Sequence, residues 1–325
     1  MMKNGRFGRR ALGGLVLLAV TPCTALVACS GRGGRAPRSA TEPGSRRDTP
    51  ALELRLMTFN IRFDTPDDGV NAWPNRREMA NGVVREQAPD VVGIQEAMPN
   101  QLTDMAVPLK YAHVGVPRAD GREGGGELSA ILFREERLEA KESGTFWLSP
   151  TPETPGSTGW GNHVPRICTW AHFVDREARR PFWVFNTHLD HESQPARAHG
   201  IELIVQRMRE RSGSEPVFLM GDLNADETNA VVLYLKGLAA RASEGTTPVP
   251  ASPRFVDTYR TRFPNEKQSG TFNFWRGETG GMKIDFIFAA APPATEVLDA
   301  AILHTSREGR FPSDHYPVVA HVRVR

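Results

Sequence analysis

The chain has 325 residues, of which 39% are apolar and 24% are charged, and this composition is typical of a globular protein with a sizeable core. The first 50 residues carry nine basic and two acidic side chains, which leaves 31 basic and 36 acidic residues in 51–325. The resulting net charge of −5 argues against the broad cationic surface of a processive nuclease.

The N-terminal residues have the pattern of an export signal. Four basic residues precede an uncharged run from Ala11 to Ala28, and that run ends in Leu26-Val27-Ala28-Cys29. These four residues resemble a bacterial lipobox, which implies that residues 1–28 are a signal peptide and that Cys29 becomes the lipidated first residue of the mature chain. Two alternatives stay open at this point, an uncleaved membrane anchor and a twin-arginine signal.

Residues 29–50 are rich in Gly, Pro, Ser and Arg and have no apolar periodicity, so we interpret them as a disordered tether. Acyl chains on Cys29 imply stable anchoring to a membrane. We therefore expect an exported lipoprotein, and Ser30 after the cysteine favours the outer membrane or the cell surface. No second linker or repeat follows, so residues 51–325 are predicted to form one domain.

Apolar runs bounded by turn residues predict many strands and few helices in this domain. The expected strands are Leu52–Phe63, Asp90–Gln95, Tyr111–Val116, Leu128–Phe133, Thr145–Leu148, Arg166–Val174, Phe182–Asn186, Val217–Met220, Lys283–Phe288 and Val318–Val324. The expected helices are Asn75–Glu86, Asn100–Ala106, Gln194–Arg211 and Asn229–Leu238. Strands alternate with helices only in part, which favours an α+β fold of two mixed sheets packed together with helices outside.

One strand end carries a carboxylate and an amide two positions apart. The buried run Val217–Met220 meets Gly221, and Asp222 and Asn224 follow. Residues i and i+2 of a strand face the same way, so the two side chains are expected to leave the sheet edge side by side, where they can orient a water and a phosphate oxygen. The alternative interpretation is a strand followed by an Asx turn.

Other strand ends also carry polar groups where turn residues are expected. Asn60, Glu96 and His188 each follow an apolar run, and Asp314-His315 precedes one. Asp285 lies inside the apolar run Ile284–Phe288, and a buried carboxylate needs a partner. We expect His315 to be that partner.

Six motifs in this order resemble the endonuclease/exonuclease/phosphatase superfamily, the DNase-I-like fold. They are N-I-R, I-Q-E, N-T-H-L-D, G-D-L-N-A, K-I-D-F-I-F and S-D-H-Y-P-V, and they span Leu54 to Arg325. The segment from Gly144 to Trp170 is similar to an exported bacterial branch of that family. The resemblance implies that residues 51–325 form a four-layer αββα sandwich with the catalytic site at one edge of the two sheets.

The resemblance also implies a role for each polar strand end. The metal, Mg²⁺ with Mn²⁺ as a substitute, would be held by Glu96 with help from Asn60, Asp314 and waters. Asp222 would orient or deprotonate the attacking water, and Asn224 would hold the phosphate. His315, oriented by Asp285, would bind a non-bridging oxygen, and His188 would donate to the phosphate or protonate the leaving group.

Three positions limit what the resemblance implies. Arg62 stands where several nuclease branches have an acid, which weighs against a second metal site. Lys283-Ile284-Asp285-Phe286 lacks the cysteine-aspartate-arginine motif of inositol phosphatases. Arg166 lies where many relatives contact phosphate, or it pairs with a surface acid, whereas His191 reads as a loop histidine rather than a zinc ligand.

The expected protein is therefore a monomeric, membrane-anchored Mg²⁺-dependent phosphoesterase that hydrolyses a phosphodiester by metal-assisted water attack. Three alternatives stay open: an extracellular nuclease resembling deadenylases or DNases, a phospholipid diesterase resembling sphingomyelinase, and a catalytically silent binding lipoprotein. The complete set of site residues weighs against the last, because a degenerate scaffold has no reason to keep it.

Overall fold

The computed structural model describes residues 51–122, 125–243, 255–290 and 295–324. The predicted signal peptide, Cys29 and the tether lie outside these residues, and they stay predictions. Among the described residues, no helix combines the length and the apolar character needed to cross a membrane.

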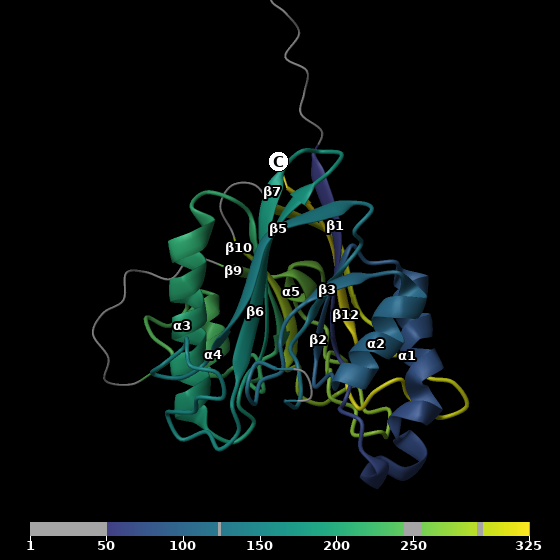
Figure 1. Cartoon of the computed structure of the whole chain (residues 1–325). Coiled ribbons are helices and arrows are strands. Elements are labelled where there is room, and N and C mark those ends of the chain that lie inside the picture. The colour runs from purple at the N-terminus through teal and green to yellow at the C-terminus, as the bar shows by residue number, and fades with distance from the viewer. Residues whose placement is uncertain (1–50, 123–124, 244–254, 291–294, 325) are drawn as a thin grey trace, which may run out of the picture. The chain divides into compact units, whose positions relative to one another are not determined.

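Two six-stranded mixed sheets form the centre of the domain (Figure 1). The strand order of the first sheet is β11 (Thr295–Ile302), β12 (Val318–Val324), β1 (Leu52–Asn60), β2 (Val91–Gln95), β4 (Ile131–Phe133) and β3 (Ala112–Val114). That of the second is β5 (Leu138–Trp147), β6 (Ile167–Asp175), β7 (Pro181–His188), β8 (Val217–Asp222), β10 (Asp285–Ala290) and β9 (Phe255–Asp257). Only the β1–β2 and β7–β8 pairs are parallel among the described strands.

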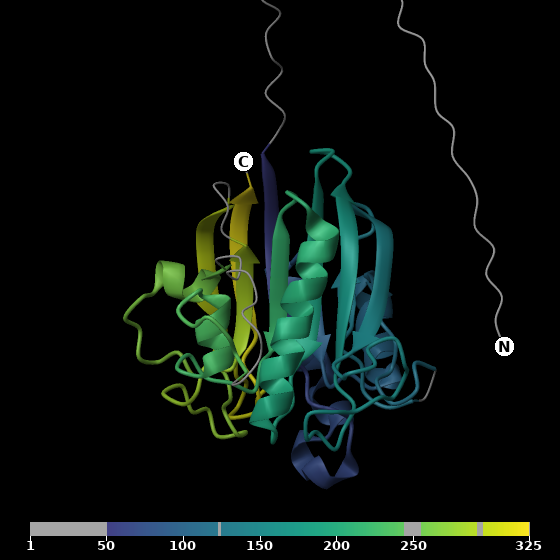
Figure 2. The same ribbon diagram turned by 90° about the vertical axis from the view of Figure 1, so that its left-hand side faces the viewer.

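Helices cover the outer face of each sheet. The first sheet is covered by α1 (Trp73–Gln87) and α2 (Pro99–Leu109), and the second by α3 (Gln194–Ser212) and α4 (Ala230–Leu235), as Figures 1 and 2 show. A 3₁₀ helix, η1 (Pro66–Asn71), precedes α1, and the short α5 (Thr258–Arg262) follows β9. The predicted four-layer αββα sandwich is confirmed.

The alternating pattern of β1 explains the layering. Leu52, Leu54 and Leu56 face the apolar core between the sheets, whereas Met57 and Phe59 face the core under α1 and α2. A third apolar core lies between the second sheet and α3 with α4. With both faces buried, a strand reads as a nearly continuous apolar run, which is how most of the central strands were recognised.

The elements that the sequence pattern missed lie at sheet edges. The strand predicted at Thr145–Leu148 is longer in the structure and begins at Leu138 as β5. Lys141 and Glu142 in its middle are charged and exposed to solvent. The edge strands β9 and β11 and the short α5 were not predicted at all. β11 keeps charged residues on its exposed face, and β9 is only three residues long, so neither strand has the apolar run that marks a central strand.

A buried polar network joins the two sheets next to the loops that build the site. Asn186 on β7 donates from Nδ2 to the carbonyl oxygens of Ile94 (2.9 Å) and Ala130 (2.8 Å), and its Oδ1 accepts from Gln95 Nε2 at 2.7 Å. A Cβ atom on Gly93 would lie 2.6 Å from Asn186 Oδ1, so only glycine leaves room for this side chain. The end of β2 is thus fixed relative to the end of β7.

Replacing Asn186 by alanine should lower the free energy of unfolding by about 3 kcal/mol, because three buried hydrogen bonds between the two sheets are lost. Urea denaturation of the purified protein measures this. The control is Asn75→Ala, which removes a single exposed hydrogen bond and should cost about 0.5 kcal/mol or less. Equal midpoints for the two variants would contradict the role assigned to the network.

Candidate active site

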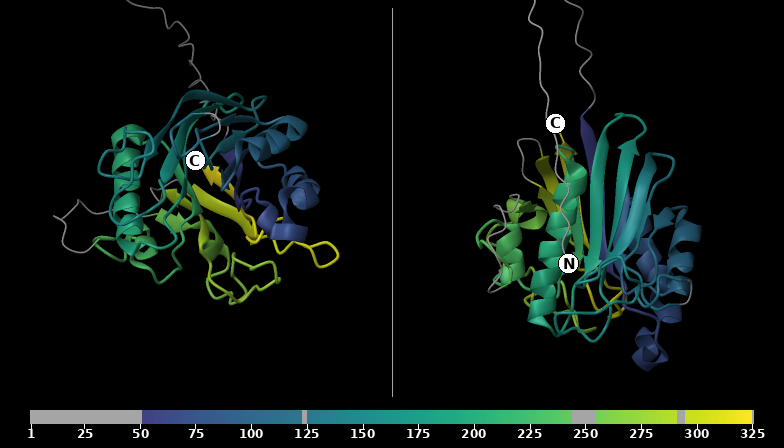
Figure 3. Two further views of the ribbon diagram at one scale, coloured as in Figure 1. Left: turned by 60° about the horizontal axis from the view of Figure 1, so that its bottom comes forward. Right: turned by 60° about the vertical axis from the view of Figure 1, so that its left-hand side comes forward.

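The registers of three neighbouring strands place polar residues in one row at an end of the second sheet. His188, the last residue of β7, is paired with Asp222 at the end of β8, and Asp222 is paired with Asp285 at the start of β10. The first sheet contributes Asn60 at the end of β1, whose Nδ2 lies 3.0 Å from Asp222 Oδ2. The two sheet ends therefore meet at Asp222, at the end of the domain that Figure 3 (left) turns forward.

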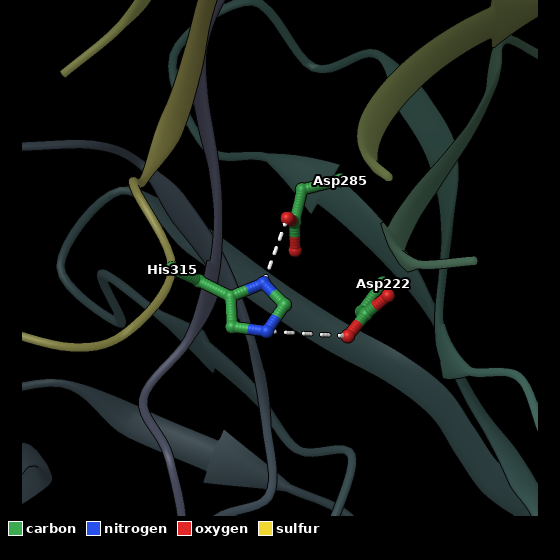
Figure 4. Close-up of side chains that lie close together, drawn as sticks. All are labelled: Asp222, Asp285 and His315. Atoms are coloured by element: carbon green, nitrogen blue, oxygen red, sulfur yellow. Dashed lines mark hydrogen bonds and ion pairs between the residues drawn. The ribbon is translucent and has the colours of Figure 1, made fainter. Parts of the chain in front are cut away.

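His315 lies between two carboxylates (Figure 4). Its Nδ1 is 2.9 Å from Asp285 Oδ2, and its Nε2 is 3.8 Å from Asp222 Oδ2. The predicted Asp285–His315 pair is thus present. Burial disfavours the charged ring, but the charge of Asp285 and its hydrogen bond outweigh burial and raise the pKa of His315 to about 10. The ring is therefore an imidazolium at neutral pH.

Asp222 uses its two oxygens differently. Oδ1 accepts the backbone N–H of Asn224 at 2.8 Å, and Oδ2 faces Asn60, His188 and His315. Burial and the nearby negative charge of Asp285 raise the pKa of Asp222 to about 7. A carboxylate with a pKa near neutrality is suited to accept a proton from water.

The relation between Asp222 and Asn224 does not follow from strand alternation. The strand β8 ends at Asp222, and Asn224 has a left-handed backbone with φ 45°. This is the Asx turn of the alternative interpretation, and it directs the Asn224 side chain to His188, with Asn224 Nδ2 2.9 Å from His188 Nε2. Just before the turn, Gly221 permits the close approach of β7 and β8, because a Cβ atom there would lie 2.0 Å from the carbonyl oxygen of Thr187.

His188 is buried and neutral. Burial lowers its pKa well below the ordinary value, and the positive charges of Arg166 and Arg118 lower it further. Its Nε2 accepts from Asn224 Nδ2, which places the proton on Nδ1, an atom without a hydrogen-bond partner among the described residues. His188 therefore keeps one polar atom free for a further contact.

The two carboxylates predicted to bind a metal, Glu96 and Asp314, lie on the side of the first sheet. Glu96 accepts from Asn60 Nδ2 at 3.0 Å and from the backbone N–H of Phe63 at 3.2 Å. Asp314 also lines the pocket, and burial, with Glu96 nearby, raises its pKa. Both carboxylates line the pocket, and carboxylate oxygens are the donors that a hard divalent cation prefers. Asn60 directs its amide nitrogen toward Glu96 and Asp222, whereas its oxygen accepts from Arg62 N.

A second group could also hold a metal ion. Asp222, Asp285 and His315 offer ligand atoms that all lie within 4.8 Å of one another. Both ring nitrogens of His315 already face carboxylates, however. A histidine must lose a proton to bind a metal, so a cation there would have to displace one of these contacts, whereas the Glu96 side offers carboxylates alone.

The site residues surround a pocket of about 580 Å³. The structure brings together all the residues predicted from the sequence for this site: Asn60, Glu96, Arg166, His188, Asp222, Asn224, Asp285, Asp314 and His315. Asn60 and Asp285 are not among the residues that line the pocket, so they act through their neighbours.

Arg166 is buried beside this pocket with one guanidinium nitrogen unused. Its Nε lies 3.3 Å from Asp190 Oδ2, and its Nη2 is 2.8 Å from His191 Nδ1. The partner acid, Asp190, is itself buried, so the pair is not the surface contact considered from the sequence. Nη1 has no hydrogen-bond partner among the described residues. His191 is engaged by this arginine and belongs to no group of metal-ligating side chains in the described chain.

Five charged or polar residues of the pocket were not predicted. They come from loops and helix starts, where no apolar run marks them: Arg118, Glu127, Arg197, Asp226 and Asn229. In the sequence they are indistinguishable from surface residues, and only the folded loops bring them to the site.

Comparison with known proteins agrees with the fold. The model of the endonuclease/exonuclease/phosphatase family matches residues 57–315. The chain is similar to an endonuclease/exonuclease/phosphatase from Bacteroides vulgatus, with 29% identity, a TM-score of 0.73, and coverage of 84% of this chain and 100% of that one. It is also similar to a mannosyl-6-phosphatase of Bacteroides thetaiotaomicron, with 31% identity, a TM-score of 0.70, and coverage of 83% and 99%. A curated mimivirus relative, uncharacterized protein L388, is 26% identical over 190 residues, which span 54% of this chain and 68% of that protein.

Replacing Asp285 by asparagine should remove the positive charge of His315 near neutral pH. In the wild-type protein the raised pKa keeps the ring protonated from about pH 6 to 9, and this ionisation stabilises the fold fully below about pH 6.5 and progressively less as pH rises toward 10. In Asp285→Asn the burial effect dominates, so the pKa falls. Proton–nitrogen NMR of the ring in EDTA measures the titration, and the exposed Asp299→Asn variant is the control. An unchanged His315 signal in Asp285→Asn would contradict the pairing.

Proposed function

Because the chain belongs to the endonuclease/exonuclease/phosphatase family and is a hydrolase of phosphate esters, we propose that it is a Mg²⁺-dependent phosphatase that acts on a phosphorylated sugar. The main support is that one pocket combines a base, a cationic hydrogen-bond donor and a cation site. Asp222 is the base, the His315 imidazolium is the cationic donor, and Glu96 with Asp314 is the cation site.

The choice of substrate departs from the phosphodiester favoured by the sequence. The relative of stated activity with 31% identity is a mannosyl-6-phosphatase, and it aligns along 99% of its chain. A phosphate monoester carries up to two negative charges, and the pocket offers the His315 imidazolium together with the unused Nη1 of Arg166. A phosphodiester is the second candidate, because a pocket of about 580 Å³ has room for groups on both sides of a phosphate.

Asp222 is assigned to the attacking water. Its Oδ2 is held by Asn60, and its Oδ1 by the Asn224 backbone, so the carboxylate has a fixed direction. With a pKa near 7 it is ionised in part at neutral pH and takes up the proton that the water loses as the oxygen–phosphorus bond forms.

Three further side chains are assigned to the phosphate. His315 donates from Nε2 to a non-bridging oxygen, because Asp285 occupies Nδ1 and the contact with Asp222 is long at 3.8 Å. Asn224 is assigned to donate to the phosphate from Nδ2, in place of its present contact with His188 Nε2. His188 is assigned to the leaving oxygen, because release of that contact lets the neutral ring carry its proton on Nε2 and donate it there.

Glu96 and Asp314 are assigned to Mg²⁺, with Mn²⁺ as a substitute. These residues would hold a divalent cation, whose chemistry would be to polarise the phosphoryl group and offset negative charge on the leaving oxygen. Few protein ligands suit Mg²⁺, which retains several waters. Arg62, which stands where several nuclease branches have an acid, forms a two-point contact with Asp68 and approaches Glu96 Oε2 to 3.9 Å, so this position contributes a positive charge and no second metal ligand.

We also propose that the protein acts as a monomer held to the membrane through lipid on Cys29. The support is the sequence alone, namely the lipobox that ends in Cys29 and the tether of residues 30–50. Such an anchor would keep the domain beside substrates outside the cytoplasm.

Replacing Asp222 by asparagine should lower kcat about 10²–10⁴-fold, because the side chain keeps its shape but loses its ability to accept a proton. Release of phosphate is measured with mannose 6-phosphate, an aryl phosphate, an aryl phosphodiester and single-stranded RNA, each with Mg²⁺ and with EDTA. We expect turnover of the monoesters in Mg²⁺ alone, with Asp299→Asn equal to wild type. Turnover that survives in Asp222→Asn or in EDTA would contradict the mechanism, and exclusive cleavage of the diesters would select the second candidate.

Replacing Cys29 by serine should move the protein from the membrane fraction to the soluble exported fraction, because the acylated thiol is gone. Incorporation of labelled palmitate and partition into detergent are measured in a bacterial host. Cys23→Ser, in the same segment, is the matched control and should stay acylated. Loss of labelling in the control as well, or membrane retention of Cys29→Ser, would overturn the anchor.

A further inference from the structure

An Arg–Glu pair lines the pocket without taking part in the assigned chemistry. Arg118 and Glu127 lie in the segment between β3 and β4, and the backbone N–H of Arg118 donates to the carbonyl oxygen of Glu127 at 2.9 Å. Their side chains meet at 2.6 Å between Arg118 Nη2 and Glu127 Oε1, and both are mostly buried, with 16% and 17% of their surface exposed. Both line the pocket.

The pair retains most of its hydrogen-bonding capacity. A guanidinium carries five N–H donors and a carboxylate two acceptor oxygens. The contact between the two side chains is the only hydrogen bond that either makes within the described residues. The position of Arg118 is fixed independently, because its carbonyl oxygen accepts from Trp147 Nε1 at 2.6 Å. The remaining donors and acceptor are thus held in place beside the pocket.

The charge of the pair indicates a neutral ligand. Arg118 and Glu127 together carry no net charge, and the nearest charges that act on both, Glu96 and Arg166, are of opposite sign. The pair therefore presents no net positive charge to hold a second phosphate of a nucleic-acid backbone. Groups that both donate and accept hydrogen bonds, as hydroxyls do, match a carboxylate oxygen beside guanidinium N–H groups.

Aromatic stacking does not compete for this part of the pocket. Its two aromatic side chains, Phe63 and Phe272, are already engaged. The Arg62 guanidinium lies 4.3 Å from the centre of the Phe63 ring, and Phe272 packs on His315 at 4.8 Å. Each of these rings therefore already has a cationic side chain packed against it, which disfavours stacking of a nucleobase.

We propose that Arg118 and Glu127 form a subsite that binds vicinal hydroxyl groups of the sugar whose phosphate is hydrolysed. The proposal rests on the proposed function, since it names the part of that substrate next to the scissile ester. Glu127 accepts from one hydroxyl, and Arg118 donates to the same or the neighbouring oxygen. The pair determines specificity and takes no part in bond cleavage.

The test compares two phosphate monoesters that differ in the group beyond the ester oxygen. Mannose 6-phosphate has vicinal hydroxyls, and p-nitrophenyl phosphate has none. The ratio of their kcat/KM values is measured for wild type, Arg118→Met and Glu127→Gln. We expect this ratio to fall at least about tenfold in each variant, as loss of a charge-assisted hydrogen bond predicts. Glu53→Gln removes an Arg–Glu contact of 2.7 Å at the start of β1, the strand end opposite Asn60, and should leave the ratio unchanged.

The outcomes separate the subsite from the proposed function. An unchanged ratio in both pocket variants would overturn the subsite, and so would parallel losses on the two esters, because that pattern marks a structural pair. A wild-type protein that hydrolyses neither ester would instead overturn the proposed function. Glu127→Gln keeps the shape of the side chain, and its melting temperature confirms that the fold is intact.

Discussion

The site depends on a buried positive charge held between two buried carboxylates. Placing ions in an apolar interior is costly unless each has a partner, and here one imidazolium serves both Asp285 and Asp222. The strand register brings the acids opposite each other, and the loop before β12 supplies His315. Removing one member would leave the others unpaired, so the geometry of this row is strongly constrained.

The surrounding polar contacts maintain that row. Thr271 accepts from the backbone N–H groups of Ile284 and Asp285 through its hydroxyl, and its carbonyl oxygen accepts from Tyr316 N. Ser313 donates to the carbonyl oxygen of Asn60, which ties the His315 loop to the first sheet. The two sheets therefore meet at one site, and displacing one strand end would also displace the other.

The sequence alone predicted the features that depend on burial of apolar strands and on the order of the motifs along the chain. Central strands are apolar on both faces, and polar residues at their ends stand out, so Asn60, Glu96 and Asp222 were identified without coordinates. Edge strands such as β11 were missed because their exposed faces are charged. The sequence predicted that both Asp222 and Asn224 lie at the site, but for the wrong reason. A left-handed turn, and not an extended strand, brings Asn224 there. Arg118 and Glu127 could not be found, because their pairing depends on how a loop folds.

In the proposed mechanism the pocket separates the cation from the row of His188, Asp222, Asp285 and His315. Crystals grown with Mn²⁺ test this separation, because the anomalous signal of the metal locates it independently of the protein density. We expect a peak beside Glu96 and Asp314, with His315 still hydrogen-bonded to Asp285. A peak among Asp222, Asp285 and His315 would contradict it, because the histidine would then be a metal ligand and could not be the cationic donor.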